Sequence, residues 1–229
     1  MPQLPSAVIF DFNGTLFFDS DKHIAAWKRY FSLHGFPDLS EEVFRERFLG
    51  RNNAEILEKL YGHPLPPDET EREAEAKEAL YRRICLEHPN ELHLVAGVEH
   101  LFDELTARHI PFTLATGSNL SNVQFYFETF GLGRWFDLSR VVYDDGSIPG
   151  KPDPTIYRLA LQVLGEQRDI DPTSVMVFED SFSGMHAARA AGVGRIIALT
   201  TPESIPYVRA VGLADTVLTN LSDLSFMGL

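Results

Sequence analysis

Short apolar segments that end in polar residues are the feature that most limits what this 229-residue chain can fold into. The run Ala7–Phe10 is apolar throughout and ends at Asp11, which is typical of a buried strand with a polar group at its carboxyl end. Strands that alternate with helices predict βαβ units and a parallel sheet covered on both faces, so we expect a three-layer α/β domain. The other predicted strands are 112–115, 141–143, 175–178 and 195–199, and the predicted helices between them include 98–108, 155–164 and 184–191.

The segment from about residue 17 to 91 has a different pattern. It contains helical periodicity without a convincing strand, and Ser40 followed by two glutamates is typical of a helix N-terminus. We therefore predict an α/β core at 1–16 and 92–229, with an all-helical cap inserted at 17–91. Ligands of open parallel sheets bind beyond the carboxyl ends of the strands, so an insert after the first strand is expected to act as a lid. The predicted cap helices are 22–34, 40–49, 54–61 and 68–88.

Composition excludes several classes of partner. The formal net charge of −13 disfavours binding to nucleic acid or to an anionic membrane surface. No apolar run approaches the ~20 residues that span a bilayer, and the start of the chain lacks the pattern of a secretory signal. Cys85 is the single cysteine, which excludes an intramolecular disulfide. We expect a cytoplasmic protein, monomeric or weakly dimeric, without nucleic-acid or membrane partners.

Four polar clusters follow predicted strands, and the topology brings all four to one edge of the sheet. Taken singly, each is typical of a turn or a helix cap. Together they offer complementary chemistry, because carboxylates, hydroxyl groups and a lysine would meet at one place. The clusters are 11–16, 115–119, 150–154 and 178–184.

These residue types suit phosphoryl transfer. The carboxylate of Asp11 could attack phosphorus, while Lys151 neutralises negative charge on the phosphoryl oxygens. Glu179 and Asp180 add hard oxygen ligands which, with Asp11, suit Mg²⁺. The expected phosphate-binding site lies at the start of a helix and consists of Thr116, Gly117, Ser118 and Asn119.

The order and spacing of these motifs resemble the haloacid dehalogenase superfamily, in its branch of small phosphatases and β-phosphoglucomutase-like enzymes. The resemblance covers nearly the whole chain and implies a Rossmann-like core with a helical cap. It also implies that Asp11 is the nucleophile and that Thr116 and Lys151 contact phosphate. The implied Mg²⁺ ligands are Asp11, Glu179, Asp180 and the backbone carbonyl of Asn13.

Asn13 departs from the family pattern, which places a second aspartate two residues after the nucleophile as the acid and base. An amide cannot carry out that proton transfer, whose loss typically costs ~10²–10⁴ in rate. One interpretation is a slow phosphatase that favours acyl phosphates, phosphoanhydrides or aryl phosphates, whose leaving groups need little protonation. Others are that Asn13 was introduced in place of a natural aspartate, that the chain binds phosphorylated ligands without efficient turnover, or that Asn13-Gly14 deamidates to aspartate.

The predicted cap supplies candidate substrate residues. His23 and Trp27 lie one helical turn apart and share a face. Core packing is the simpler role for Trp27, but the mutase-like branch has a similar His-x-x-x-Trp that faces its active site. The segment Gly50-Arg51-Asn52 resembles the substrate-specificity loop of that branch, and Arg51 could pair with a second phosphate or a carboxylate. Asn53 stands where the mutases carry an arginine, which weakens the mutase interpretation.

The sequence therefore predicts a Mg²⁺-dependent phosphohydrolase of small phosphorylated metabolites that acts through an aspartyl-phosphate on Asp11. A β-phosphoglucomutase-like phosphomutase is the alternative enzyme. A non-catalytic protein that binds phosphorylated ligands is the alternative outside catalysis.

Overall fold

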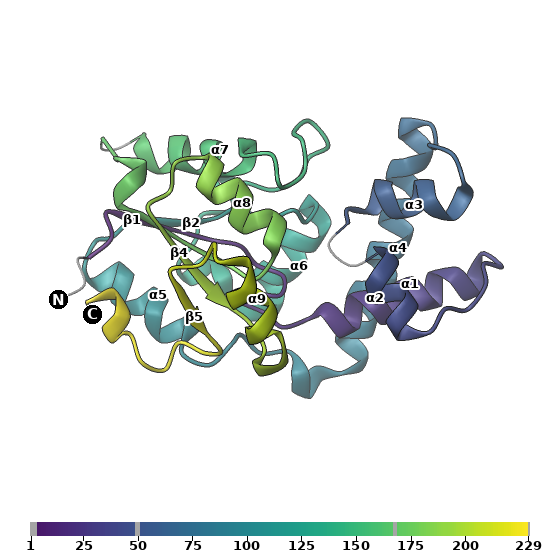
Figure 1. Cartoon of the computed structure of the whole chain (residues 1–229), viewed down its shortest axis with the longest axis horizontal. Coiled ribbons are helices and arrows are strands. Elements are labelled where there is room, and N and C mark those ends of the chain that lie inside the picture. Colours follow the sequence, from purple (N-terminus) through teal and green to yellow (C-terminus); the bar gives the residue numbers. More distant parts are fainter. Residues whose placement is uncertain (1–3, 49–50, 167–168, 229) are drawn as a thin grey trace. The chain divides into compact units, whose positions relative to one another are not determined.

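The computed structural model describes residues 4–48, 51–166 and 169–228 (Figure 1). The chain divides into two compact units. The core unit consists of Met1–Phe18 and His93–Leu229, and the helical unit consists of Asp19–Leu92. The domain limits predicted from the sequence remain a proposal.

The core unit contains a five-stranded sheet in the order β2-β1-β3-β4-β5, in which all neighbours are parallel. Phe10 pairs with Leu114 on one side and with Phe178 on the other, so β1, β2 and β3 end at the same edge. The residues that follow these ends therefore come together in space. The strands are β1 (Ala7–Phe10), β2 (Phe112–Leu114), β3 (Val175–Glu179), β4 (Arg195–Leu199) and β5 (Thr216–Leu218).

Alternate side chains of the central strands pack on opposite faces of the sheet, as the pleat requires. Ile9 and Val177 join a core with side chains of α7 (Thr155–Gly165) and α8 (Phe182–Ala190). Phe10 faces the other way and meets Phe102 of α5 (Val98–Ala107), with ring centroids 5.2 Å apart. Figure 1 shows α7 and α8 on one side of the sheet and α5 on the other. The remaining helices of this unit are α6 (Leu120–Phe130) and α9 (Ile205–Val211).

The helical unit is built around the packing of α1 (Ser20–Leu33) against α4 (Pro67–Glu87). Between them come α2 (Glu41–Phe48) and α3 (Asn53–Tyr61). Aromatic side chains dominate its core, and Trp27, Tyr30 and Phe31 are all almost fully buried. This unit can therefore bury an apolar core of its own.

The predicted fold class, a three-layer parallel-sheet core with an inserted helical segment, is confirmed. One expected strand, 141–143, is present only as a single parallel bridge between Val142 and Ala115. Beyond the bridge, the Asp144 amide donates to the carbonyl of Ser118 at 3.0 Å, and the Gly146 amide donates to the Asp144 side chain at 2.9 Å, so the chain bends before a longer ladder forms. Within the described ranges, no helix is both long enough and apolar enough to cross a membrane.

Candidate active site

A tight turn after β1 places Asp11 at the carboxyl edge of the sheet. The Asp11 amide donates to the carbonyl of Phe178 at 3.0 Å, which extends the ladder by one residue. The chain then folds back on itself, and the Gly14 amide donates to the Phe17 carbonyl at 2.8 Å. Gly14 has φ +74°, and a Cβ at this position would lie 2.2 Å from an oxygen of Asp180. Glycine is therefore required both by the backbone conformation and by the carboxylate packed against it.

Lys151 joins two carboxylates at this edge. Its Nζ lies 2.6 Å from Oδ1 of Asp11 and 2.5 Å from Oε1 of Glu179. Thr15 donates to Oδ2 of Asp11 and to Oδ1 of Asp180, each at 3.3 Å. The candidate nucleophile thus has one carboxylate oxygen held by an ammonium group and the other by a hydroxyl.

Glu179 is completely buried, and both of its carboxylate oxygens accept hydrogen bonds. Oε1 accepts from Lys151 and from the hydroxyl of Tyr157 at 2.7 Å. Oε2 accepts from the backbone amides of Asp180 and Ser181 and from the Ser181 hydroxyl, at 2.9 to 3.0 Å. These bonds fix the carboxylate in one orientation and hold Lys151 against Asp11.

The two carboxylate partners of Lys151, Asp11 and Glu179, have pKa values shifted in opposite directions. Burial raises the pKa of Asp11 to about 7, because Lys151 offsets only part of the desolvation and Glu179 adds repulsion. Burial also acts to raise the pKa of Glu179, but Lys151 and the donors on both oxygens outweigh it and lower that pKa. The same two carboxylates raise the pKa of Lys151 against its own burial, which keeps it charged.

Three carboxylates at this edge form a cluster that fits a divalent cation. One oxygen each of Asp11, Glu179 and Asp180 lie within 4.8 Å of one another. Lys151 pairs with Asp11 and Glu179, so with all three carboxylates ionised this group of four side chains would carry a net charge of −2. Hard oxygen donors with that charge are what Mg²⁺ selects. Asp11 and Asp180 are the simplest direct ligands, since Glu179 would first have to exchange one of its hydrogen-bond donors.

Beside this cluster, the turn after β2 presents hydroxyl and amide groups. Thr116 is buried, and its hydroxyl accepts from the Ser118 amide at 3.1 Å. The side chain of Asn119 accepts from the Asn122 amide at 3.0 Å and caps the N-terminus of α6. A Cβ at Gly117 would contact nothing within 4 Å, so the backbone there is approachable. The predicted phosphate residues thus lie at a helix start, where anions bind favourably.

The Asn13 side chain is held by hydroxyl groups of this same turn and helix. Its Nδ2 donates to the Tyr126 hydroxyl at 2.7 Å, and its Oδ1 accepts from the Ser118 hydroxyl at 2.7 Å. Thr116 lies at 3.5 Å from the same Oδ1, at the limit of hydrogen bonding. Residue 13 is therefore oriented by the predicted phosphate turn together with α6.

A family model described as haloacid dehalogenase-like hydrolase matches residues 5–192. The phosphorylated carbohydrates phosphatase of Thermotoga maritima is 30% identical over 194 residues, which cover 83% of each protein. The chain belongs to the haloacid dehalogenase-like hydrolases. The fructose-1-phosphate phosphatase YqaB of Escherichia coli is 28% identical over 192 residues, covering 83% of this chain and 95% of that protein.

Solved structures of haloacid dehalogenase-like proteins are similar in fold over nearly the full length of this chain. A family IA hydrolase from Entamoeba histolytica is 32% identical, with a TM-score of 0.84 and coverage of 96% of both chains. CbbY from Rhodobacter sphaeroides in complex with xylulose-(1,5)-bisphosphate is 26% identical, with a TM-score of 0.79, covering 99% of this chain and all of that one. A β-phosphoglucomutase from Clostridium difficile, 21% identical with a TM-score of 0.75, shares the fold.

Roles for Thr15, Tyr126, Tyr157 and Ser181 at this candidate site were not predicted from the sequence. Thr15 lies inside the first polar cluster and could have been found from its spacing to Asp11. Tyr126 and Tyr157 lie on helical faces that also carry core residues, and their burial is what the pattern indicates. The pattern does not indicate where a tyrosine hydroxyl points.

In the helical unit, His23 belongs to a buried ionic cluster. Lys77 is 1% exposed and lies 2.8 Å from Nδ1 of His23 and 2.8 Å from Oε1 of Glu78. Asp19 is fully buried, lies 3.4 Å from Nε2 of His23 and accepts from the Tyr81 hydroxyl at 2.5 Å. Trp27 is 3% exposed and packs within the helical core, with the Lys77 ammonium 5.3 Å from its ring centroid.

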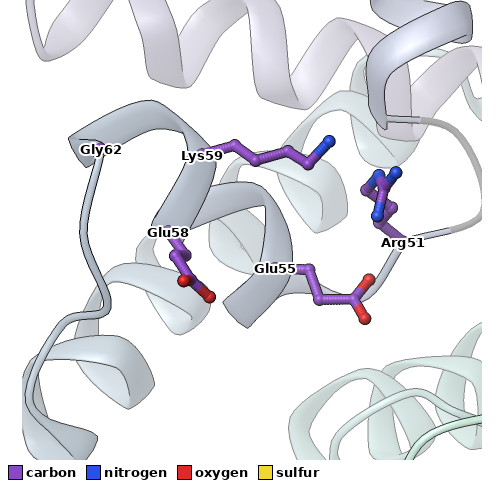
Figure 2. A pocket seen from close by; sticks show the side chains of 5 residues that line it. All are labelled: Arg51, Glu55, Glu58, Lys59 and Gly62. Carbon is purple, nitrogen blue, oxygen red and sulfur yellow. The ribbon is translucent and has the colours of Figure 1, made fainter.

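The predicted substrate-specificity loop is described only in part, because Gly50 lies outside the described residues. Asn52 caps α3 by accepting from the Glu55 amide at 2.9 Å. Arg51 is exposed and donates through Nε to the carbonyl of Arg47 at 3.0 Å. It lines a hollow of about 380 Å³ with Glu55, Glu58, Lys59 and Gly62 (Figure 2).

Proposed function

We propose that this hydrolase is a Mg²⁺-dependent phosphatase of small phosphorylated metabolites, with phosphorylated carbohydrates as the first substrate class to test. The observation that carries the proposal is the group formed by Asp11, Lys151, Glu179 and Asp180 beside the hydroxyl-rich turn after β2. The names of the relatives support this substrate class, since they include phosphatases of phosphorylated carbohydrates and of fructose 1-phosphate.

The covalent step would use the Asp11 carboxylate. One of its oxygens forms a bond to phosphorus while the bond between phosphorus and the leaving-group oxygen breaks. Water then attacks the phosphorus of the aspartyl-phosphate, which releases inorganic phosphate and restores the carboxylate. Lys151 and Thr15 hold the carboxylate in place, and Lys151 also offsets charge on the phosphoryl oxygens.

The phosphoryl group would be held by Thr116, Gly117, Ser118, Asn119 and Lys151. Asp11, Asp180, the backbone carbonyl of Asn13 and, after exchange of a donor, Glu179 would hold Mg²⁺. The ion would neutralise negative charge shared between the nucleophile and the phosphoryl oxygens. The helical unit would act as a substrate-selecting cap, with His23, Trp27, Gly50, Arg51 and Asn52 as the candidate contacts.

Asn13 sets the expected selectivity for leaving groups. An amide cannot protonate the departing oxygen, so alkyl phosphates should turn over slowly. Acyl and aryl phosphates need little protonation and should be the better substrates. We expect a preference of at least ~10² in kcat/KM, which reports the step that expels the leaving group, for acetyl phosphate over an alkyl sugar phosphate; this is the size of a lost acid step.

The test is phosphate release from sugar phosphates, glycerol phosphate, p-nitrophenyl phosphate and acetyl phosphate, with Mg²⁺ and with EDTA. We expect activity with Mg²⁺, loss with EDTA and loss in Asp11→Asn. Asp145→Asn is the matched control, because Asp145 lies in an exposed turn with Ser147. Binding of inorganic phosphate without release from any substrate would replace the phosphatase by a binding protein.

A further inference from the structure

Asn13, Tyr126 and Ser118 form a closed cycle of hydrogen bonds. Asn13 Nδ2 lies 2.7 Å from the Tyr126 hydroxyl, that hydroxyl lies 3.2 Å from the Ser118 hydroxyl, and the Ser118 hydroxyl lies 2.7 Å from Asn13 Oδ1. We propose that Tyr126 is a positioning residue which, with Ser118, locks the Asn13 amide in place and protects it from conversion to aspartate. Only the expected effect on turnover rests on the proposed phosphatase function.

The chemistry of the amide fixes the direction of every bond in the cycle. Nδ2 can only donate and Oδ1 can only accept, so Tyr126 must accept from Asn13 and Ser118 must donate to it. The Tyr126 hydroxyl hydrogen is then left to donate to Ser118. Within the cycle, each of the three groups donates one hydrogen bond and accepts one, so the three bonds are mutually compatible.

An ionised aspartate at position 13 would not fit the same cycle. An ionised carboxylate only accepts, so both hydroxyl groups would have to turn their hydrogens toward it. Tyr126 could then no longer donate to Ser118, and their oxygens would face each other without a hydrogen. The cycle is therefore matched to the amide that the sequence carries at this position.

Packing holds Tyr126 in place for this role. The residue is 1% exposed, and its ring stacks on that of Phe12 with centroids 4.2 Å apart and planes 15° apart. Phe12 precedes Asn13 directly, so the stack joins α6 to the backbone beside Asn13. Asn119 caps the start of α6. The position of the hydroxyl is thus set by an aromatic contact that remains when the hydroxyl is removed.

Asn13 is susceptible to deamidation because a glycine follows it. The Gly14 nitrogen can attack Cγ of the amide and expel ammonia, and water then opens the cyclic imide to aspartate or isoaspartate. Two features oppose this attack. The Gly14 amide donates to the Phe17 carbonyl at 2.8 Å, and the hydrogen-bond cycle prevents Cγ from rotating toward the nitrogen.

Tyr126→Phe tests the proposal, because it removes the hydroxyl and keeps the stack on Phe12. During incubation of the folded protein, peptide mass mapping should show deamidation at Asn13 accelerated roughly fivefold, the population change that corresponds to one lost hydrogen bond. In nitrogen-15 NMR, the side-chain amide hydrogens of Asn13 should also exchange faster with heavy water. Ser118→Ala, which breaks the other side of the cycle, should give the same two changes.

Tyr30→Phe is the matched control. It removes a buried tyrosine hydroxyl that donates to Glu73 in the helical unit, and it should leave Asn13 unaffected. Equal deamidation in the parent protein, Tyr126→Phe and Ser118→Ala would overturn the proposal, as would equal acceleration in Tyr30→Phe. Aged Tyr126→Phe should also gain turnover of alkyl phosphates as aspartate forms. Deamidation without any gain in turnover would leave the positioning role intact and count against the phosphatase function.

Discussion

Each unit of the molecule places a largely enclosed lysine among acidic side chains, but the two clusters differ in their balance of charge. In the core unit, Lys151 pairs with Asp11 and Glu179, the carboxylate of Asp180 lies in the same acidic cluster, and burial raises the pKa of Asp11 to about 7. A cluster with excess negative charge is strained by repulsion and suits a bound cation.

In the helical unit, Lys77 pairs directly with Glu78 and lies next to His23. Burial acts to raise the pKa of Glu78, but the charges of Lys77 and His23 and the hydrogen bonds from Lys77 and Asn53 lower it to about 2. This cluster is closer to neutral, and its carboxylate is stabilised as an anion. Because both units hold a lysine beside carboxylates, such a pair does not by itself indicate an active site. The excess of negative charge is what distinguishes the cluster that we propose as catalytic.

Replacing each of the two lysines by methionine should have the largest effects, on activity for Lys151 and on stability for Lys77. Lys151→Met should lower phosphate release by about 10³, because it removes charge stabilisation at the reacting group. Lys77→Met should instead lower the free energy of unfolding by about 3 kcal/mol, since it leaves the buried Glu78 carboxylate without the ammonium group that neutralises it. Steady-state phosphate release and urea unfolding measure the two quantities. Similar loss of activity in both folded variants would contradict the distinction between the clusters.

A smaller effect concerns acid stability. The pKa of Glu78 is about 2 in the folded protein against an ordinary value of 4.5. Between these two pH values, the folded state therefore binds fewer protons at this carboxyl group than the unfolded state does. Its contribution to stability is therefore present above pH 4.5 and is lost as the pH falls toward 2. The contribution is at most about 3 kcal/mol.

Glu78→Gln tests this sign directly. The difference in unfolding free energy between the parent protein and Glu78→Gln should be greatest near neutral pH and should shrink as the pH is lowered. Glu87→Gln is the control, because Glu87 is exposed and pairs with Arg29 on the surface of the same unit. A difference that stays constant with pH would show that the Glu78 carboxylate is not stabilised as described.

The fold could be predicted from the sequence because its signals are local. Polar residues follow the apolar strands, and the parallel pairing of β1 with β3 places Asp11 and Glu179 at the same edge of the sheet. The loop before α7 then brings Lys151 within hydrogen-bond distance of both carboxylates. The short strand β5 (Thr216–Leu218) was not among the predicted strands. Its three half-buried residues give too short an apolar run to stand out from the loop sequence around them.

The partners of the site residues could not be predicted in the same way. The hydrogen bond between Asn13 and Tyr126 joins residues that are 113 positions apart in the sequence. The contact between Lys77 and His23 joins residues that are 54 positions apart. Such contacts depend on the side-chain directions of two packed elements, which periodicity does not encode. Asn119 and Asn52 illustrate the opposite case, since asparagine before a helical pattern is a recognisable N-cap and both residues do cap helices.

The most direct test of the account is to trap phosphate on Asp11. The protein would be quenched in acid during turnover of phosphorus-32-labelled acetyl phosphate, then mapped after borohydride reduction of the acyl phosphate. Because Asn13 cannot activate water, the aspartyl-phosphate should accumulate on Asp11, be absent in Asp11→Asn and be depleted in Asn13→Asp. Phosphate release at the same rate without label on Asp11, or label that persists in Asp11→Asn, would contradict the role of Asp11 as nucleophile.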